Sequence, residues 1–462
     1  MNIRELIVDM LIEIENGKSY SHILIRNVLD KYGYFPAKDR AFIKRVTEGT
    51  LERRIQIDYI INAYSKVPAE KMKPLIRNLL RMSVYQILFM DAVPDAAACN
   101  EAVKLAAKRK FQNLKGFVNG VLRNIARQKE RIGYGCGVDK AKAADFYPDS
   151  KRNPVAYLSV FYSMPEIIVR IWLKEYGMEQ TERMLQAMLE IRPVTVRIKE
   201  SLTEKEKEDW LAKIEKKGIG IRRHSYLPYA YCLDHAEGIR SVPGFEEGLF
   251  AVQDVSSMLC VECAGIKEGD FVVDVCAAPG GKSTHGAEKT GKTGRVLARD
   301  ISAQKTAYIR ENAKRQGLNI ETEIADAMEY DEELEGLADV LLADVPCSGL
   351  GVLGRKRDIK YNITEEMLAK LPGIQRKILD TVWRYVKPGG ILVYSTCTIR
   401  KEENEENAGW FLKNFPFTAE DISSRLENVP GTETAQEGYI QLLPDIHETD
   451  GFFIAVFRRE KH

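Results

Sequence analysis

The chain has 462 residues, 45% of them hydrophobic, and a formal net charge of +1 at pH 7. This length favours two or three domains, and the composition is typical of globular proteins with a core of normal size. A net charge so near zero excludes a chain that is basic or acidic throughout, so any surface for a polyanion must be local.

The charge is unevenly distributed along the chain. Residues 1–130 contain 23 Lys and Arg against 14 Asp and Glu, whereas the remaining residues contain 45 against 53. A basic first third indicates a polyanionic partner, although a solvated helical surface would give the same count.

The cysteines and the N-terminus indicate an intracellular protein. Eight cysteines are scattered through the chain, unlike the dense disulfide framework of a small secreted protein. Cys260 and Cys263 form a CxxC pair, but no second pair or histidine cluster completes a zinc site, so we expect no metal. Glu5 and Asp9 argue against a signal peptide, and no uncharged run is long enough to span a membrane. We therefore expect a cytoplasmic protein with no membrane partner.

The first 245 residues predict a helical domain and a smaller mixed module. Residues 1–130 have only helical periodicity and predict an all-α bundle. Residues 131–154 are expected to form a linker, because glycine and polar residues dominate its first part. The small α+β module is expected over 155–245. Its predicted elements, in chain order, are a helical stretch over 155–190, a strand over 192–199 and a helix over 205–218.

Residues 246–462 alternate between strands and helices. Apolar strands joined by helices predict an α/β Rossmann-like domain, in which a parallel sheet is covered on both faces. Two late strands, 439–443 and 452–457, are expected to form an antiparallel edge pair. A helix is expected over 373–386, and the expected parallel strands are 271–275, 295–300, 319–326, 339–345 and 390–396.

The segment CAAPGGKST (276–284) follows the first of these strands and opens a helix. Its small residues let backbone N–H groups approach a ligand closely, and a helix N-terminus favours an anionic group. A phosphate-binding P-loop would need glycine where Cys276 stands, and the G-x-G-x-x-G dinucleotide fingerprint is absent.

Three of the predicted strands end on acidic residues, Asp300, Asp326 and Asp344. Ligands of doubly wound sheets bind at the carboxyl ends of the strands. Three carboxylates there suit a ribose, an adenine amino group and an ammonium, all of which S-adenosylmethionine offers, and its own carboxylate would face Gly280 and Gly281. Each aspartate taken singly is better explained as a strand-end turn residue. Three in succession after such a loop favour this cofactor.

Two cysteines, Cys347 in DVPCSG and Cys397 in YSTCT, lie just beyond strand ends. Methylation of an oxygen or a nitrogen needs no thiol, but carbon 5 of a pyrimidine becomes nucleophilic only after a thiolate has added to carbon 6. Cys397 alone is better explained by core packing, whereas beside a second cysteine it is predicted to be a nucleophile. Its thiol is not expected to be strongly acidic, because Glu402 and Glu403 oppose the nearby helix N-terminus.

DVCAAPGGKS, the aspartate strand ends, DVPCSG and YSTCT resemble the bacterial and eukaryotic RNA cytosine-5 methyltransferases over about 240–460. The resemblance implies that Cys397 is the nucleophile and that Cys347 assists release of the covalent adduct. Arg299, next to an acidic strand end, is a mild departure. The residues implied to bind S-adenosylmethionine are Cys276, Ala277, Ala278, Pro279, Gly280, Gly281, Lys282, Asp300, Asp326 and Asp344.

RMSVYQILF and GFVNGVLRNI in the first third resemble the NusB-type RNA-binding domain. The fusion of the two domains implies the RsmB type, which methylates small-subunit ribosomal RNA at cytosine 967. We expect a monomer that uses its basic side chains to contact phosphates. The expected contacts are Arg40, Lys44, Arg45, Arg53 and Arg54, and a second cluster of Lys104, Lys108, Arg109 and Lys110.

Arg357, Asp358 and Lys360 follow the DVPCSG loop. They are expected either to approach the target base or to lie in an ordinary solvated loop. Other functions also stay open at this point. They are a cytosine-5 methyltransferase of another RNA, a DNA methyltransferase acting through Cys347, and a non-catalytic RNA-binding factor for ribosome assembly or antitermination.

Overall fold

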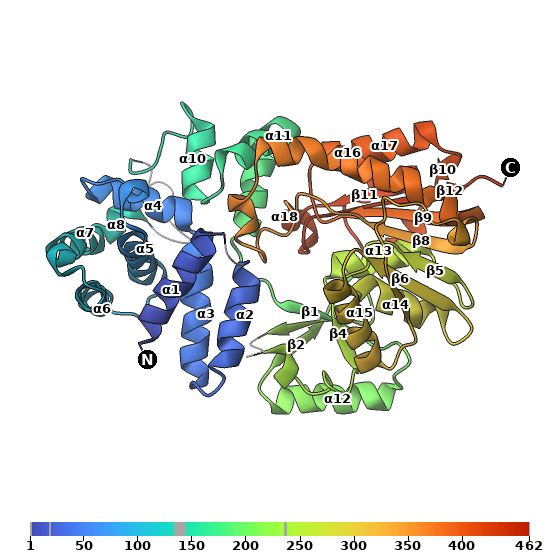
Figure 1. The fold of residues 1–462 in the computed structure, drawn as a ribbon, viewed down its shortest axis with the longest axis horizontal. Helices are drawn as coiled ribbons and strands as arrows, with labels where there is room; N and C mark the ends of the chain where they lie inside the picture. The colour runs from blue at the N-terminus through green and yellow to red at the C-terminus, as the bar shows by residue number, and fades with distance from the viewer. Residues whose placement is uncertain (1, 18–19, 134–144, 235–237, 462) are drawn as a thin grey trace. The chain divides into compact units, whose positions relative to one another are not determined.

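The computed structural model describes residues 2–17, 20–133, 145–234 and 238–461 (Figure 1). The chain forms two compact units. One comprises Met1–Glu190 and Leu353–Asn362, and the other Ile191–Val352 and Ile363–His462. A short segment that follows the DVPCSG loop in sequence therefore belongs to the N-terminal unit.

The first unit is helical, as predicted for residues 1–130 (Figure 1). The central helix α5 is buried along most of its length and packs against α1, α3, α4, α6 and α7. Of the expected linker, residues 134–144 lie outside the described part. The helices are α1 (Ile3–Glu15), α2 (Ser21–Lys31), α3 (Ala37–Glu52), α4 (Arg54–Tyr64), α5 (Pro74–Phe89), α6 (Asp95–Lys108), α7 (Lys115–Arg127), α8 (Lys129–Ile132), α10 (Pro154–Phe161) and α11 (Glu166–Ala187).

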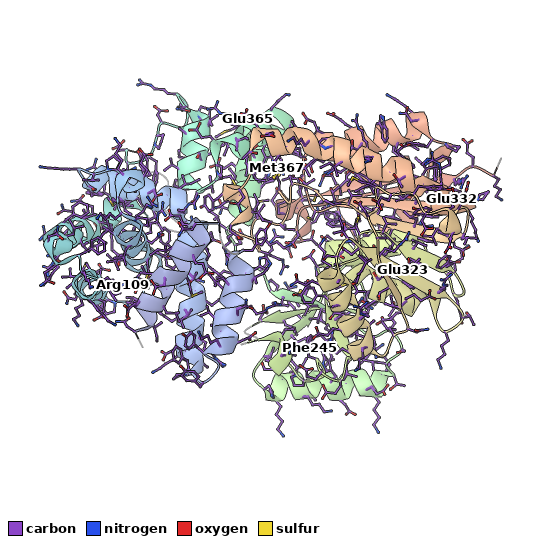
Figure 2. The ribbon with its side chains drawn as sticks, viewed as in Figure 1. Arg109, Phe245, Glu323, Glu332, Glu365 and Met367 are labelled. Atoms are coloured by element: carbon purple, nitrogen blue, oxygen red, sulfur yellow. The ribbon has the colours of Figure 1, made fainter. Side chains whose placement is uncertain are left out.

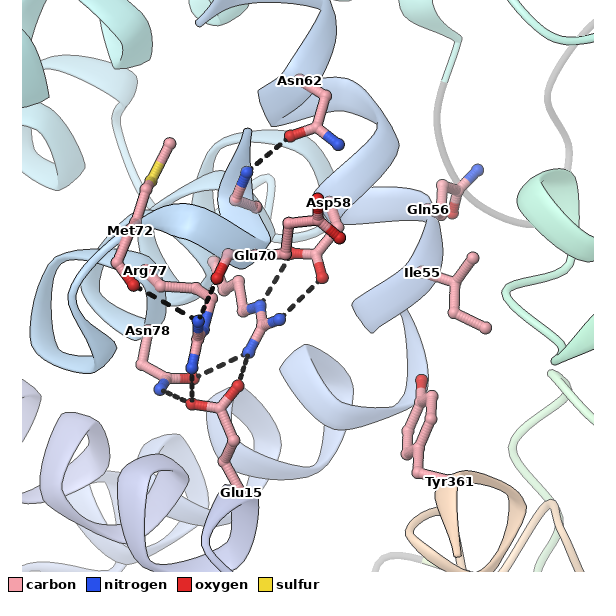
Figure 3. A network of polar contacts seen from close by, with 12 residues as sticks. Glu15, Ile55, Gln56, Asp58, Asn62, Glu70, Met72, Arg77, Asn78 and Tyr361 are labelled. Carbon is pink, nitrogen blue, oxygen red and sulfur yellow. Dashed lines mark hydrogen bonds and ion pairs between the residues drawn. The ribbon is translucent and has the colours of Figure 1, made fainter. Parts of the chain in front are cut away.

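A buried ion-pair network joins α1, α4 and α5 (Figure 3). Arg81 donates two hydrogen bonds of 2.7 Å to Asp58 and one of 2.7 Å to Glu15. Arg77 lies 2.9 Å from the other Glu15 oxygen, and these partners lower the pKa of Glu15 to about 2 against the opposing effect of burial. Because the arginines share their carboxylates, each charge stays compensated inside the bundle.

The second unit contains two sheets (Figure 1). The smaller one is antiparallel with the order β2-β3-β1-β4, and α12 (Glu204–Lys216) packs against β2. This sheet confirms the strand and the following helix that the sequence predicted here. Its strands are β1 (Val194–Ile198), β2 (Gly220–Arg223), β3 (Ala230–Asp234) and β4 (Phe250–Val252).

The larger sheet has eight strands in the order β10-β12-β9-β8-β5-β6-β7, with β11 also paired to β12. Five neighbouring strands, in the order β9-β8-β5-β6-β7, are parallel, which confirms the Rossmann-like expectation. The strands are β5 (Phe271–Asp274), β6 (Arg295–Asp300), β7 (Glu321–Ile324), β8 (Ala338–Asp344), β9 (Val386–Thr396), β10 (Phe417–Ala419), β11 (Tyr439–Leu442) and β12 (Phe452–Arg459).

Helices cover both faces of the parallel strands. Val272 and Val340 pack with apolar side chains of α13, whereas their neighbours in sequence, Val273 and Leu341, pack with those of α16 and α17. This alternation explains why the strands are apolar throughout. The helices of this unit that pack around the sheet are α13 (Val255–Ala264), α14 (Gly281–Thr290), α15 (Ala303–Gln316), α16 (Glu365–Val382), α17 (Glu405–Asn414) and α18 (Pro444–His447).

Four details differ from the predicted elements. The strand expected over 319–326 covers only Glu321–Ile324, so Asp326 follows this strand and does not end it. The helix expected from residue 373 begins at Glu365 and contains Pro372, and the strand expected from 390 begins at Val386. The late strands do pair antiparallel, but β12 is not at the edge, because it lies between β9 and β10. Within the described residues, no single helix is long and apolar enough to cross a membrane. Only α10 and α11 taken together, bent by 120°, meet that criterion.

His285 of α14 is fully buried beside a group of charged residues. Its Nε2 lies 3.6 Å from Glu262, and its ring packs edge-on against Tyr229. Glu200, Glu262 and His285 have the spacing of metal ligands, but the Lys289 ammonium lies 2.8 Å from Glu200 and 2.7 Å from Glu262. The carboxylates are therefore already neutralised by a lysine. Burial lowers the pKa of His285 to about 3.

Replacing His285 by glutamine is expected to reduce the acid sensitivity of folding. As the pH falls from 7 to 5, an unfolded histidine takes up a proton near pH 6.5, whereas folded His285 does not, so the folded state loses about 2 kcal/mol of relative stability. The urea unfolding midpoint of the parent should therefore fall over this range more steeply than that of His285→Gln. Equal pH dependence of the two proteins would contradict the buried neutral ring.

Gly351 lies against the backbone of Gly451. A Cβ on Gly351 would come within 1.8 Å of the Gly451 carbonyl oxygen, and Gly351 N–H donates to the carbonyl of Cys397. We predict that Gly351→Ala lowers the free energy of unfolding by about 1–3 kcal/mol, because backbone atoms must move apart. Gly409→Ala in α17 is the control, since a Cβ there has no neighbour within 4 Å. Urea denaturation of both variants tests this, and equal effects would contradict it.

Candidate active site

The candidate active site lies at the carboxyl ends of the parallel strands. In the register of the sheet, Asp274 of β5 pairs with Leu342 of β8, and Asp344 of β8 pairs with Ser395 of β9. The segments that leave β5, β6, β8 and β9 therefore emerge at one edge. The sheet thus brings together the loop 276–284, the aspartates and both cysteines.

The loop between β5 and α14 needs a glycine at position 280, because its backbone there is left-handed. Gly280, the N-cap of α14, has φ of 100°, and a Cβ there would lie 3.2 Å from Ile309 Cα. Ala278 N–H donates a 2.9 Å hydrogen bond to Asp300 at the end of β6. The loop is thereby fixed to the next strand, and the N-terminus of α14 stays directed toward the sheet edge.

Asp300 and Asp326 differ in their surroundings. Asp300 is 4% exposed. Its carboxylate also accepts a hydrogen bond from Ile301 N–H and forms an ion pair of 3.0 Å with Lys305. Asp326 is half-buried and accepts a 2.9 Å hydrogen bond from Met328 N–H. Arg299 makes ion pairs with Glu323 at 3.1 Å and with Asp331 at 2.6 Å, so its charge is compensated away from the Asp300 carboxylate.

Lys282 and Asp344 form an ion pair between the cofactor loop and β8. Lys282 Nζ lies 2.7 Å from Asp344, whose other oxygen accepts a 2.9 Å hydrogen bond from Ser395. Burial lowers the pKa of Lys282, but the attraction of Asp344 outweighs it and raises that pKa. Lys282 was predicted among the cofactor ligands. In the structure it orients the Asp344 carboxylate.

Asp274, the last residue of β5, was not among the residues predicted for the site. Its side chain is buried, it accepts a 2.6 Å hydrogen bond from Ser283, and burial raises its pKa to about 7. The signal was present, because Asp274 ends a strand directly before the loop, as Asp300 and Asp344 end theirs.

The two cysteines that were predicted to act together lie in contact. Cys347 Sγ and Cys397 Sγ are 3.2 Å apart, and both side chains are half-buried. The hydrogen bond with Cys397, then burial and the nearby Glu403, raise the pKa of Cys347. The thiol of Cys347 is therefore harder to ionise than that of an ordinary cysteine.

Glu403 supports the loop of Cys347 from inside the protein. Its carboxylate is fully buried and accepts 2.9 Å hydrogen bonds from Ser348 N–H and from Gln375, while Arg400 lies 3.7 Å away. The sequence indicated that the charge of Glu403 opposes ionisation of Cys397, but its burial was not foreseen. Glu403 therefore positions the backbone directly after Cys347.

The predicted phosphate contacts in the early helices divide into exposed and buried residues. Lys44 and Arg45 are exposed on α3, and Arg40 is half-buried with a 3.1 Å hydrogen bond to the Gly33 carbonyl. Arg53 is 6% exposed and lies over Phe89, so it presents no open cation to a phosphate. Arg54 stacks on Tyr361 at 3.4 Å and lines a cavity of about 730 Å³ within the helical unit.

The second predicted cluster lies at the end of α6, where Figure 2 labels Arg109. Arg109 and Lys108 pair with carboxylates of α1 at 2.9 Å and 2.5 Å, and Lys104 pairs with Glu101 of its own helix at 2.9 Å. Lys104, Lys108 and Lys110 are exposed. Exposed pairs of this kind are worth little, so a phosphate can replace the carboxylates.

Arg357, Asp358 and Lys360 do not lie in a solvated loop, because each is paired within the helical unit. Arg357 pairs with Glu48 and Glu52, and Asp358 accepts hydrogen bonds from Ser21. Lys360 is 4% exposed, and its ammonium donates to the carbonyls of Glu52 and Ser163 at 2.8 and 2.6 Å.

Burial lowers the pKa of Lys360 to about 7. These contacts are within one unit and hold the segment Leu353–Asn362 in the helical bundle. Of the two expectations for this segment, the ordinary solvated loop is therefore wrong, and an approach to the target base stays a prediction.

Comparison with known proteins agrees with this arrangement. Residues 263–458 match the family model of the 16S rRNA methyltransferase RsmB/F, residues 1–127 match the NusB family, and residues 164–240 match the ferredoxin-like domain of RsmF/B-like methyltransferases. The solved structure of PH0851 has a TM-score of 0.79 over 99% of both chains at 24% identity, which supports the fold. A methyltransferase homolog from Pyrococcus horikoshii is 28% identical with a TM-score of 0.55, covering 66% of this chain and 99% of that one.

Two curated bacterial proteins match over nearly the whole chain. The probable ribosomal RNA small subunit methyltransferase B of Bacillus subtilis (strain 168) is 34% identical over 99% of both chains. The ribosomal RNA small subunit methyltransferase B of Cronobacter sakazakii is 31% identical over 98% of both. The chain therefore belongs to the ribosomal RNA small subunit methyltransferase B family, whose members are S-adenosylmethionine-dependent RNA methyltransferases.

Proposed function

We propose that this protein methylates carbon 5 of a cytosine in small-subunit ribosomal RNA, at the position corresponding to cytosine 967, through a covalent adduct with Cys397. The observation that carries this proposal is the 3.2 Å contact between Cys347 and Cys397, at the edge of the sheet where Asp300 and Asp344 also lie. Methyl transfer to a nitrogen or an oxygen would require neither thiol.

Cys397 is the nucleophile on this proposal, because YSTCT resembles the segment that carries the nucleophile in the RNA cytosine-5 methyltransferases, and the raised pKa of Cys347 supports a protonated partner thiol. A protonated Cys347 donates its S–H to Cys397 and thereby favours the thiolate at Cys397. The Cys397 thiolate adds to carbon 6 of the cytosine, which gives carbon 5 the electron density to form a bond to a methyl group. S-adenosylmethionine, when bound, supplies that group as an electrophilic methyl sulfonium.

Release of the product requires loss of the proton from carbon 5 and of the thiolate from carbon 6. Once Cys397 is bonded to the base, its hydrogen bond with Cys347 is broken. Cys347 is then the nearest protein thiol to the adduct and is assigned to release. After it has given its own proton to solvent, its thiolate takes the proton from carbon 5, the C5–C6 double bond re-forms and Cys397 leaves carbon 6 as a thiolate. The Glu403 carboxylate holds the Ser348 backbone, so that Cys347 stays in place throughout.

The chain offers a donor set that fits S-adenosylmethionine. Asp300 is proposed to bind the ribose hydroxyls, Asp326 the adenine amino group and Asp344 the ammonium, while Gly280 and Gly281 face the carboxylate at the start of α14. Lys282 acts indirectly, because its ammonium neutralises and orients Asp344. The remaining residues proposed to line the site are Cys276, Ala277, Ala278 and Pro279.

The exposed basic side chains of the helical unit are proposed to hold the RNA through its phosphates. Lys44 and Arg45 lie on α3, and Lys104, Lys108 and Lys110 lie at the end of α6. Removing any one of these cations should reduce the salt dependence of binding, because fewer counterions are then released from the RNA.

Methyl transfer tests the proposed function directly. Ribosomal RNA from cells that lack this gene should receive a labelled methyl group from S-adenosylmethionine, and mapping should find it on carbon 5 of one cytosine. A methyl group on another atom, or transfer only to DNA, would contradict the proposal.

The two cysteine variants should differ in kind. Cys397→Ala is expected to abolish transfer and to form no covalent complex, whereas Cys347→Ala is expected to accumulate an enzyme–RNA adduct that survives denaturing electrophoresis. Cys232→Ala removes a buried thiol of the smaller sheet and should retain transfer. The reverse pattern, with the adduct in Cys397→Ala, would exchange the two roles.

Asp300→Asn should weaken binding of S-adenosylhomocysteine by about 10- to 150-fold, because hydrogen bonds to a charged group are worth about 1.5–3 kcal/mol. Isothermal titration calorimetry measures this affinity. Asp421→Asn is the matched control, since Asp421 bonds locally to Ser423 at the protein surface. Equal affinities of the parent and Asp300→Asn would remove Asp300 from the cofactor site.

A further inference from the structure

The turn between α2 and α3 carries a cluster of three aromatic rings, Tyr32, Tyr34 and Phe35. Tyr32 stacks on Phe35 with ring centroids 5.2 Å apart, and Tyr34 meets Phe35 edge to face at 5.0 Å. Phe35 packs in part against the core of the helical unit. The Tyr34 ring is 76% exposed, although an aromatic ring of this size would normally be covered.

The turn holds these rings in place. Gly33 N–H donates to the Asp30 carbonyl and Phe35 N–H to the Tyr32 carbonyl, while Arg40 from α3 donates a 3.1 Å hydrogen bond to the Gly33 carbonyl. The exposed ring is thus mounted on a backbone that is hydrogen-bonded on both sides. When a ligand stacks on Tyr34, the protein therefore loses little conformational entropy.

Cations surround the rings. Residues 26–45 contain six Lys and Arg against two Asp, and Lys31 lies 5.5 Å from the centre of the Tyr32 ring. Lys38, Lys44 and Arg45 are exposed along α3, and Lys38 and Arg45 are about 10 Å apart along the helix axis. Because they are seven residues apart, Lys38 and Arg45 lie on the same face of α3, and Lys38 is in the first turn of the helix that follows the aromatic turn.

We infer that this surface binds a single-stranded segment of RNA, with one base stacked on Tyr34 and the neighbouring phosphates on Lys38 and Arg45 of α3. An exposed ring beside a row of cations is the combination that binds single-stranded nucleic acid. A protein partner fits less well, because lysine is depleted in protein–protein interfaces. The inference rests on the proposed RNA substrate and adds a stacking site outside the candidate active site.

The test compares two kinds of variant in the full chain. Binding of a fluorescently labelled single-stranded RNA oligonucleotide is measured by anisotropy over a range of salt concentrations. Tyr34→Ala should weaken binding by about 5- to 150-fold at every salt concentration and leave the salt dependence unchanged. Tyr34→Phe should bind as the parent does, because the ring remains.

The double variant Lys38→Ala, Arg45→Ala should instead change the slope of log affinity against log salt, by about 0.7 for each phosphate that no longer meets a cation. Ile191→Ala is the control, since Ile191 is 75% exposed and has no ring. Unchanged thermal melting of the variants establishes that folding is intact.

Two results would overturn the inference. One is unchanged RNA affinity in Tyr34→Ala. If that variant instead alters self-association or binding to a protein while RNA affinity stays the same, the exposed ring serves a protein contact and the inference is wrong. The other is an equal loss of affinity in Tyr34→Phe and Tyr34→Ala. Failure of the proposed function can be told apart from failure of this inference. In the first case the parent protein would transfer no methyl group to RNA, but Tyr34→Ala would still weaken RNA binding.

Discussion

The parallel pairing of β8 with β9 is the constraint on which the candidate active site depends. Its register sets Asp344 opposite Ser395, so the segments that follow both strands leave the sheet at the same edge. Cys347 and Cys397 are thereby in contact, although 50 residues separate them in sequence. A shift of this pairing by one residue would turn every following side chain to the opposite face and separate the thiols.

At the carboxyl edge of the parallel strands, most charged side chains have a partner of opposite charge. Lys282 neutralises Asp344, and Asp274, which has no cation within hydrogen-bonding distance among the described residues, has a raised pKa instead. The hydrogen bond with Cys397, then burial and the nearby Glu403, raise the pKa of Cys347. On the proposed mechanism this arrangement separates the two thiols chemically, because a protonated Cys347 favours the thiolate at Cys397.

The sequence predicted the parallel strands well, because strands buried on both faces are apolar along their whole length. It did not predict that β12 lies inside the sheet, since strand order depends on long-range pairing that no local pattern records. The helix start at Glu365 also escapes the pattern, because proline is typical of a helix boundary, whereas the structure accommodates Pro372 inside α16.

Within the site, residue types and strand ends were enough to select the aspartates and both cysteines for attention. Their partners were not predictable in the same way. Lys282 reaches an aspartate 62 residues away, and the burial of Glu403 and Lys360 follows from tertiary packing rather than from their neighbours in sequence. Charge alone placed Arg53 and Lys360 among the RNA contacts, and burial is the property that charge counting omits.

The central claim is that Cys397, and not Cys347, forms the covalent bond to cytosine. The most direct measurement is to trap the enzyme on RNA that contains 5-fluorocytidine, whose carbon 5 cannot release its substituent as a proton, and to locate the modified peptide by mass spectrometry. The account predicts a nucleotide attached to Cys397, formed only when S-adenosylmethionine is present and carrying the transferred methyl group. A nucleotide attached to Cys347 would contradict it.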